Sequence, residues 1–221
     1  MRTVVFDLDG TLADTSADLI AAANACFRGL GHGDLLDPEQ DALTAFHGGR
    51  AMLTLGLSRL GIADDALIAA QYPVLLAAYA DGIDTHTRLY PGAVEAVQAL
   101  RAAGYATAIC TNKPEGLAET LTRRLGIRDL FGSLIGADTL PTRKPDPAPY
   151  LAAVHQAGGI PARSILIGDT ETDRKTAAAV GVPCVLVSFG PEGAGVARLA
   201  PEALLDHYRD LPALADRLLG A

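Results

Sequence analysis

Short apolar runs closed by small or polar residues recur along the chain and predict β-strands. Each run is brief and almost continuously hydrophobic. This pattern is typical of strands in a parallel sheet that is covered on both faces, because neither side of such a strand meets water. We expect strands at Thr3–Phe6, Tyr105–Cys110, Ser164–Ile167 and Pro183–Val187, and a shorter one at Ser133–Ile135.

Segments with helical patterns lie between the predicted strands. Several begin at Pro or end before Gly, which are common first-turn and C-terminal residues of helices. The alternation of strand and helix predicts an α/β fold whose core is a doubly wound, Rossmann-like parallel sheet with right-handed crossovers. The predicted helices are Pro91–Ala103, Pro114–Leu125, Pro147–Ala157 and Thr172–Val180, with an amphipathic terminal helix from Pro201 onward.

One long interval after the first strand has no strand-like run and is rich in Ala and Leu. We therefore predict two domains: an α/β catalytic core made of residues 1–14 and 88–221, and an all-helical cap domain at residues 15–87. Gly and Asp residues at the rear edge of the interval suit a hinge. The helices expected in the cap are Ala17–Leu30, Pro38–Ala45, Gly49–Leu60 and Asp64–Ala80.

The charge balance narrows the classes of partner. The chain has 26 acidic and 18 basic residues and a formal net charge of −8, with no cluster of Lys and Arg. We expect no nucleic-acid partner, because neutralising phosphates needs clustered positive charge.

No apolar stretch is long enough to span a membrane. The first strand begins at Thr3, which leaves no room for a signal peptide. The sequence therefore predicts a cytoplasmic protein.

Four carboxylates are expected at the carboxyl ends of the predicted strands. Asp7 and Asp9 follow the first strand, and Asp169 and Asp173 follow the strand that ends at Ile167. Carboxyl ends of parallel strands meet at one edge of the sheet, where ligands bind. Crowded carboxylates repel one another, and Mg²⁺ relieves this repulsion with a few oxygen ligands. We predict that Asp7, the carbonyl of Asp9 and Asp169 hold Mg²⁺, with Asp173 as a direct or water-mediated ligand.

The same edge of the sheet has the groups that phosphoryl transfer needs. Asp7 is placed to attack phosphorus, and Asp9 to protonate the leaving oxygen and later activate water. Thr111 and Asn112 follow another strand, and we expect the Thr111 hydroxyl and the Asn112 backbone N–H to bind phosphate oxygens. Lys144 would pair with Asp7 and offset the charge of the transition state. Taken singly, each residue is as well explained as a turn, a cap or a solvated side chain.

Four motifs resemble those of the haloacid dehalogenase superfamily, in the expected order and over almost the whole chain. The first motif, followed later by the acidic pair, is highly specific for that superfamily, and the other two support it. The helical insertion resembles its C1-type cap. The motifs are FDLDGT at Phe6–Thr11, TNKP at Thr111–Pro114, KP at Lys144–Pro145 and GDTETD at Gly168–Asp173.

This resemblance implies the same roles that the residues suggest. The first Asp of that superfamily is the nucleophile and the second is the acid/base, which here are Asp7 and Asp9; the Thr and Lys bind phosphate, and the last acidic pair holds Mg²⁺. An acid/base Asp favours phosphate transfer over dehalogenation. The motifs TNKP and KPDP are most similar to those of the phosphoglycolate phosphatase group. Sugar phosphomutases of the superfamily usually have a Ser pair where this chain has Thr111 and Asn112.

A glycine-containing loop of the predicted cap is a candidate for reading the substrate. Gly49 allows close approach of the backbone to a ligand, and the following helix N-terminus attracts anions. Arg50 suits a carboxylate. We expect Arg50, with His47 and Gly49 nearby, to bind the far end of the substrate; the alternative is that Arg50 and His47 are ordinary surface residues.

The sequence thus predicts a Mg²⁺-dependent phosphatase that hydrolyses a small organic phosphomonoester, with 2-phosphoglycolate as the expected substrate. Two alternatives remain open at this stage. A sugar phosphomutase would return the phosphate to its substrate and would need a bisphosphate. A non-catalytic phosphate-ligand sensor would show no turnover. The expected partner is a small phosphoester, and the chain is a monomer or a homodimer.

Overall fold

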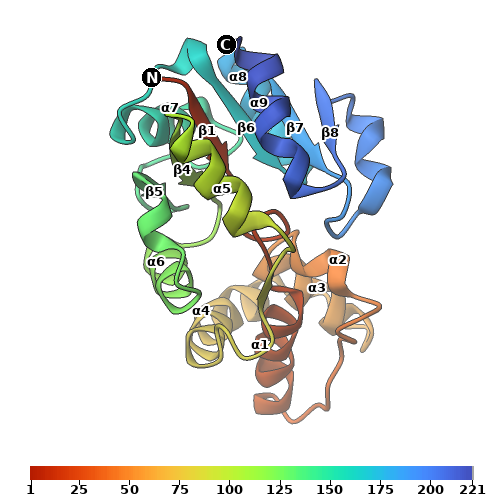
Figure 1. Ribbon diagram of the computed structural model, residues 1–221. Helices are drawn as coiled ribbons and strands as arrows, with labels where there is room; N and C mark the ends of the chain where they lie inside the picture. The colour runs from red at the N-terminus through yellow and green to blue at the C-terminus, as the bar shows by residue number, and fades with distance from the viewer. Residues whose placement is uncertain (221) are drawn as a thin grey trace. The chain divides into compact units, whose positions relative to one another are not determined.

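The computed structural model describes residues 1–220, which form two compact units. Of these residues, Met1–Ala13 and those from Leu89 onward belong to one unit, and Asp14–Arg88 form the other (Figure 1). The first unit holds the six-stranded sheet and the second is helical.

The α/β unit is built on a six-stranded sheet with the order β5-β4-β1-β6-β7-β8. All neighbouring strands are parallel, and residues Val4 of β1, Thr107 of β4 and Ile165 of β6 lie in register. The sheet is therefore the predicted doubly wound α/β arrangement. Its strands are β1 (Thr3–Phe6), β4 (Ala106–Cys110), β5 (Ser133–Ile135), β6 (Ser164–Gly168), β7 (Cys184–Val187) and β8 (Ala203–Leu205).

Helices cover both faces of this sheet, which explains why the strands are apolar throughout. On one face, Val5 and Leu166 share a buried cluster with Tyr150 of α7 and Ala177 of α8. The helices α5 and α9 pack on β4 and β6 and on each other, and Figure 1 shows them in front of the sheet. The helices are α5 (Ala93–Ala102), α6 (Glu115–Arg124), α7 (Pro147–Gln156), α8 (Glu171–Val180) and α9 (Leu211–Leu219).

The C-terminal segment differs from its prediction. We expected a helix from Pro201 onward, but residues 203–205 form the edge strand β8 and α9 begins only at Leu211. Leu204 and Leu205 fit both patterns, because two apolar residues are too few to separate a strand from a helix. Pairing with β7 decides the outcome, since Leu205 lies opposite Val187.

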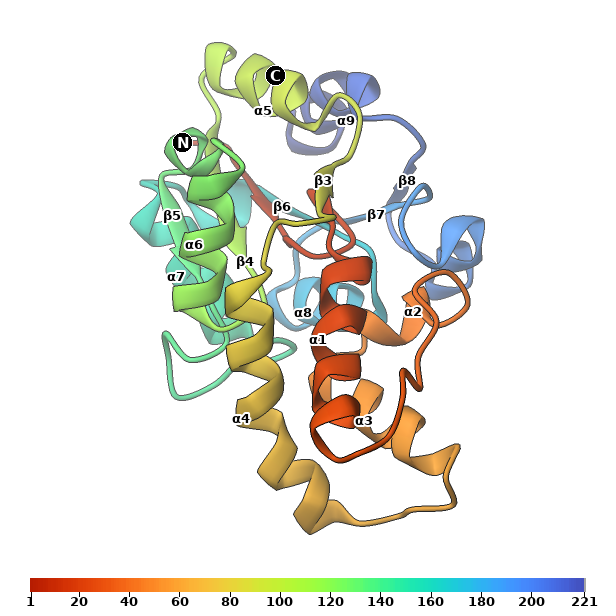
Figure 2. The same ribbon diagram turned by 90° about the horizontal axis from the view of Figure 1, so that it is seen from below.

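The helical unit has four α-helices, with α1 packed against both α3 and α4 (Figure 2). Its core includes Phe27 of α1 and Gly56 of α3, and a Cβ at position 56 would lie 2.2 Å from the Phe27 ring. The second predicted helix is much shorter than expected, because residues 38–41 form turns in which Asp37 and Asp41 accept backbone N–H groups. The helices are α1 (Ser16–Gly29), α2 (Ala42–Ala45), α3 (Gly49–Ser58) and α4 (Asp65–Asp81).

The two chain segments that connect the units pair with each other. They form a two-stranded sheet of β2 (Ala13–Asp14) and β3 (Arg88–Leu89). Just inside the helical unit, the buried carboxylate of Asp18 accepts hydrogen bonds from the backbone N–H groups of His86 and Thr87 and from the Thr87 hydroxyl, at 2.8–3.0 Å. The start of α1 is therefore tied to the returning chain by a charge-assisted contact.

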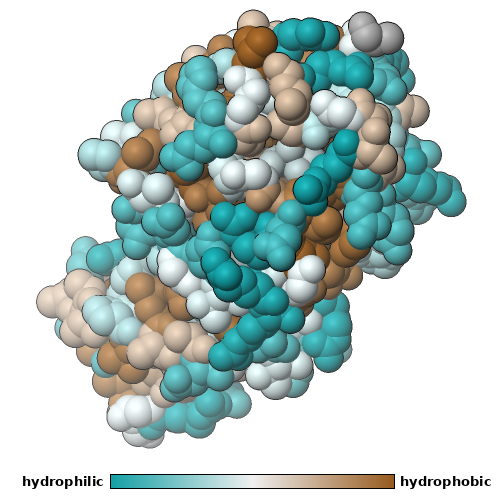
Figure 3. Space-filling view, turned by 60° about the vertical axis from the view of Figure 1, so that its left-hand side comes forward, coloured by the Kyte–Doolittle hydropathy of each residue, from teal (hydrophilic) through white to brown (hydrophobic). Residues whose placement is uncertain are grey.

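Most large apolar side chains lie in the interior. Figure 3 shows one face of the molecule, where hydrophobic residues lie scattered among hydrophilic and neutral ones. Among residues 1–220, no helix combines the length and the apolar character needed to cross a bilayer. The large hydrophobic side chains with the greatest exposure are Met1, Leu43, Leu60, Val74, Ile160 and Leu204.

Candidate active site

The carboxyl ends of β1, β4 and β6 place three polar residues at one edge of the sheet. The backbone N–H of Asp7 donates to the carbonyl of Ile167, and that of Thr111 donates to Ile135, each at 2.9 Å. The parallel ladder therefore extends past the last apolar residue of each strand. Asp169 follows β6 directly. The expected convergence of these strand ends is present.

The chain turns sharply after Asp7. Gly10 has a φ of 78°, a value that favours glycine. The loop after β7 packs against this turn at Gly190. A Cβ at Gly190 would lie 2.9 Å from the carbonyl oxygen of Gly10, so the loop can approach the turn this closely only with a glycine at position 190. The buried Tyr208 hydroxyl donates to the carbonyl of Thr11 at 2.7 Å. The loop that carries Asp9 is thus fixed by packing from two later parts of the chain.

Three carboxylates form a buried cluster at this edge. Asp7, Asp169 and Asp173 each offer an oxygen, and these oxygens lie within 4.8 Å of one another. Asp7 is 9% exposed, Asp169 2% and Asp173 0%. The Thr11 hydroxyl donates to Asp169 Oδ1 at 2.9 Å. This donor set consists of hard oxygen ligands and fits a divalent cation such as Mg²⁺ or Ca²⁺ better than a soft metal.

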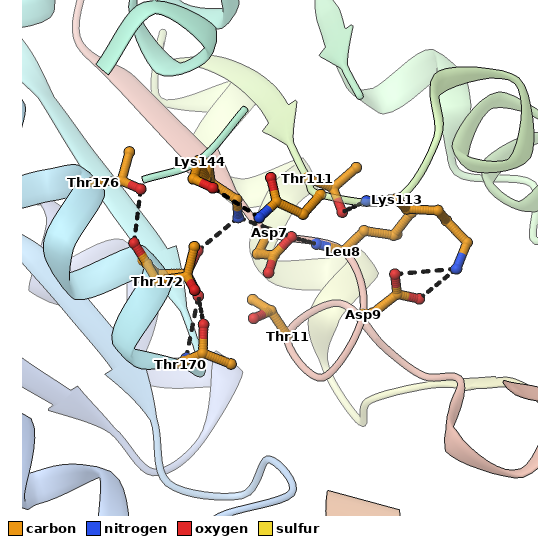
Figure 4. Close-up of polar contacts among 12 residues, drawn as sticks. Asp7, Leu8, Asp9, Thr11, Thr111, Lys113, Lys144, Thr170, Thr172 and Thr176 are labelled. Carbon is orange, nitrogen blue, oxygen red and sulfur yellow. Dashed lines mark hydrogen bonds and ion pairs between the residues drawn. The ribbon is translucent and has the colours of Figure 1, made fainter. Parts of the chain in front are cut away.

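Lys144 lies between two of these carboxylates, those of Asp7 and Asp173. Figure 4 shows it close to Asp7. Its Nζ is 3.1 Å from Asp7 Oδ1 and 2.6 Å from Asp173 Oδ1, and its side chain is 1% exposed. The side-chain amide of Asn112 donates to the backbone carbonyl of Lys144 at 3.0 Å. Asn112 therefore holds the segment that carries the lysine, a contact that the sequence did not reveal.

Asp173 has a structural task as well as its place in the cluster. Its Oδ2 accepts from the backbone N–H groups of Asp169 and Thr170 and from the Thr170 hydroxyl, at 2.9–3.2 Å, which forms a capping box at the start of α8. A Cβ at Gly168 would lie 2.3 Å from Asp173 Cγ, so glycine is needed there. With Oδ1 on Lys144, both oxygens of Asp173 are engaged by protein groups.

The pKa shifts in the cluster indicate that its negative charge exceeds its positive charge. Burial, together with the charges of Asp173 and Asp9, raises the pKa of Asp7 to about 6 against the opposing effect of Lys144. Burial, together with Asp173 and Asp7, raises the pKa of Asp169 well above its usual range. Burial lowers the pKa of Lys144, but Asp173 and Asp7 outweigh this and raise it, so Lys144 stays an ammonium ion. One lysine does not compensate three buried carboxylates.

Asp9 points away from the cluster and pairs with a second lysine. Lys113 Nζ lies 2.8 Å from Asp9 Oδ1 and 3.1 Å from Oδ2, as Figure 4 shows. Lys113 is part of the TNKP motif, but the sequence pattern alone predicts no role for it. Its position directly after two strand-end residues was the available signal. The predicted metal contact of Asp9 uses its backbone carbonyl and stays a prediction.

Thr111 is ready to donate to a ligand. Its hydroxyl oxygen accepts the backbone N–H of Lys113 at 3.1 Å, and the residue is 3% exposed. A hydroxyl that accepts in this way still has its own O–H to donate. The predicted phosphate contacts of Thr111 and of the Asn112 backbone N–H are therefore compatible with the local geometry.

His47, Gly49 and Arg50 belong to the helical unit, at the start of α3. Gly48 has a φ of 94°, and the Cζ of Arg50 lies 5.2 Å from the centroid of the Tyr72 ring, within reach of a cation–π contact. A Cβ at Gly49 would be 3.0 Å from Tyr72, so α3 and α4 approach closely here. The substrate-binding role of these residues stays a prediction.

The fold and the site together define an α/β protein of the hydrolase class. The family model for haloacid dehalogenase-like hydrolases matches residues 1–181, and the chain belongs to this family. The phosphoglycolate phosphatase of Mesorhizobium japonicum is 38% identical over 226 residues, which cover 99% of this chain and 96% of that protein. That of Rhodospirillum rubrum is 37% identical over 217 residues, covering 95% and 89%.

A solved structure has the same fold. The crystal structure of a predicted phosphoglycolate phosphatase from Haemophilus somnus superposes with a TM-score of 0.84 at 23% identity, covering 97% of each chain. Together with the relatives that are more than 35% identical, the family membership identifies the chain as a phosphoric monoester hydrolase.

Proposed function

We propose that the chain is a Mg²⁺-dependent phosphatase that hydrolyses 2-phosphoglycolate to glycolate through an aspartyl-phosphate on Asp7. The observation that carries the proposal is the position of Asp7 at the end of β1. There it lies beside both a buried ammonium group and two further carboxylates. A carboxylate in this setting is at once a nucleophile, a metal ligand and a neighbour of the phosphate-binding lysine.

The chemistry of the donor set supports a magnesium ion. Asp7, Asp169 and the Asp9 carbonyl would hold it directly, and Asp173, whose oxygens are engaged by Lys144 and the α8 cap, would contact it through water. When bound, Mg²⁺ neutralises phosphate oxygens and the clustered carboxylates. A bound cation would offset the burial and the mutual repulsion that raise the pKa values of Asp7 and Asp169.

The chain's own residues account for the two chemical steps. A carboxylate oxygen of Asp7 attacks phosphorus, the bond from phosphorus to the ester oxygen breaks, and Asp9 gives its proton to that oxygen. Asp9 then takes a proton from water, whose oxygen attacks the phosphorus and releases the Asp7 carboxylate. Lys144 and Thr111 hold the phosphate oxygens throughout, which stabilises the charge in the transition state.

A phosphoester panel with and without Mg²⁺ tests this function. We expect phosphate release from 2-phosphoglycolate to exceed that from p-nitrophenyl phosphate and glucose 6-phosphate in kcat/KM, and to stop when EDTA is added. No turnover of any ester with Mg²⁺ present would overturn the proposal in favour of a phosphate-ligand sensor. Turnover that depends on added sugar bisphosphate would identify a phosphomutase instead.

Arg50 is proposed to bind the end of the substrate that is remote from phosphorus, with His47 and Gly49 nearby. We expect Arg50→Ala to raise KM for 2-phosphoglycolate roughly tenfold or more, the usual loss for a charge-assisted contact, with little effect on KM for p-nitrophenyl phosphate. Steady-state kinetics on both esters measure the difference. If both KM values rise equally, Arg50 does not read the substrate's carboxylate.

A further inference from the structure

Lys113 is fixed in the α/β core by its own backbone. Its N–H donates to the Thr111 hydroxyl at 3.1 Å, and its carbonyl accepts the N–H of Ala137 at 2.9 Å. Its extended side chain carries the ammonium group to Asp9 (Figure 4). The position of Lys113 Nζ is therefore set by two neighbouring segments and by an ion pair with both Asp9 oxygens.

The burial of this lysine is unusual for its type. The Lys113 side chain is 3% exposed, whereas its partner Asp9 is 18% exposed. Lysine is seldom so buried unless it is paired, and an ion pair removed from water often contributes little net stability. Because Asp9 is the more accessible partner, fold stability alone is a weak reason to keep the ammonium group inside. A contact between the Lys113 ammonium group and a ligand is a better reason for this burial.

The two lysines of the site lie next to different carboxylates. Lys144 Nζ lies against Asp7 and Asp173, where the phosphate is expected. Lys113 Nζ lies against Asp9, which must reach the ester oxygen to protonate it. If Asp9 reaches the ester oxygen, a group attached one carbon beyond that oxygen would lie within reach of Lys113. In 2-phosphoglycolate the group at this position is a carboxylate.

We propose that Lys113 is a specificity-determining residue that binds a carboxylate one carbon beyond the ester oxygen while it remains in contact with Asp9. This inference rests on the proposed function and adds to it. The enzyme would then select phosphorylated 2-hydroxy acids from within its α/β core. A carboxylate has two oxygens that accept several hydrogen bonds, so Lys113 need not be its sole donor.

The test compares 2-phosphoglycolate with its neutral amide, 2-phosphoglycolamide, which has the same size and lacks the charge. Wild type is expected to have the higher kcat/KM on the acid. Lys113→Met should lower kcat/KM on the acid roughly tenfold to a hundredfold more than on the amide, mainly through KM, because a charge-assisted hydrogen bond is lost. Lys113→Arg, which keeps the positive charge, should retain most of the preference for the acid.

Lys175 provides the matched control, because it is exposed and pairs with Glu171 on the surface of α8. Lys175→Met should leave both kinetic constants unchanged. Equal losses on acid and amide in Lys113→Met would overturn the inference and leave Lys113 as a positioning residue for Asp9. If Lys113→Met unfolds, the wild-type kinetics still test the inference. Equal kcat/KM of wild type on the acid and on the amide would also overturn the inference. Turnover of neither ester by wild type would refute the proposed function itself.

Discussion

Replacing Asp7 by Asn should abolish phosphatase activity while leaving the protein folded. The amide keeps the size of the side chain and can still occupy the space beside Lys144, but it lacks the charge that attacks phosphorus. We expect kcat to fall roughly 10³- to 10⁶-fold, as when the nucleophile of other hydrolases is removed. Phosphate release from 2-phosphoglycolate and trapping of the phospho-enzyme by rapid acid quench measure the loss.

A surface aspartate separates this effect from general damage. Asp129 is exposed and its carboxylate lies outside the acidic cluster, so Asp129→Asn should keep wild-type kcat. In EDTA, the thermal unfolding midpoint of Asp7→Asn should not fall, because the change removes a buried carboxylate whose pKa is raised. Retained kcat in Asp7→Asn would show that another residue attacks phosphorus.

Removal of Mg²⁺ should both stop turnover and weaken the fold. In the metal-free protein, Asp7, Asp169 and Asp173 face one another with a single ammonium group between them. At a Mg²⁺ concentration about a hundred times Kd, binding stabilises the folded state by about 2.7 kcal/mol, which corresponds to a rise in Tm of roughly 5–10 °C. Calorimetric scans with Mg²⁺ and with EDTA measure this rise.

Asp169→Asn is the variant that shows whether the metal acts at this cluster. It removes a buried carboxylate whose pKa is raised well above the usual range. We expect its Tm in EDTA to equal or exceed that of wild type, and its response to Mg²⁺ to be lost. The variant Asp129→Asn should respond to Mg²⁺ like wild type. If Mg²⁺ raises the Tm of Asp169→Asn as much as that of wild type, the ion binds elsewhere.

The parts of the site that the sequence predicted are those tied to strand ends. Asp7, Thr111 and Asp169 each follow a short apolar run, and a parallel sheet leaves no freedom about where those ends meet. The position of Lys144 beside Asp7 was expected only from chemistry and resemblance, because Lys144 is in a loop. Its observed contact follows from Asn112 holding its backbone.

Other features depend on contacts that no local pattern encodes. The strand β8 exists because β7 offers a free edge, whereas the residues of β8 alone fit a helix equally well. The pairing of Lys113 with Asp9 joins residues 104 positions apart. The double engagement of Asp173 by Lys144 and by the α8 cap likewise has no signal in the sequence. In each case a long-range contact chose between local alternatives.

The pairing of β2 with β3 makes the helical segment modular. Since the chain leaves the α/β unit at Ala13 and re-enters it at Leu89 on adjoining strands, the strand order of the six-stranded sheet does not depend on what lies in between. An ancestor could therefore have lengthened, exchanged or redesigned the intervening helices while inheriting its reaction centre intact. Diversification of the helical unit within such a lineage needs changes in one continuous stretch of gene.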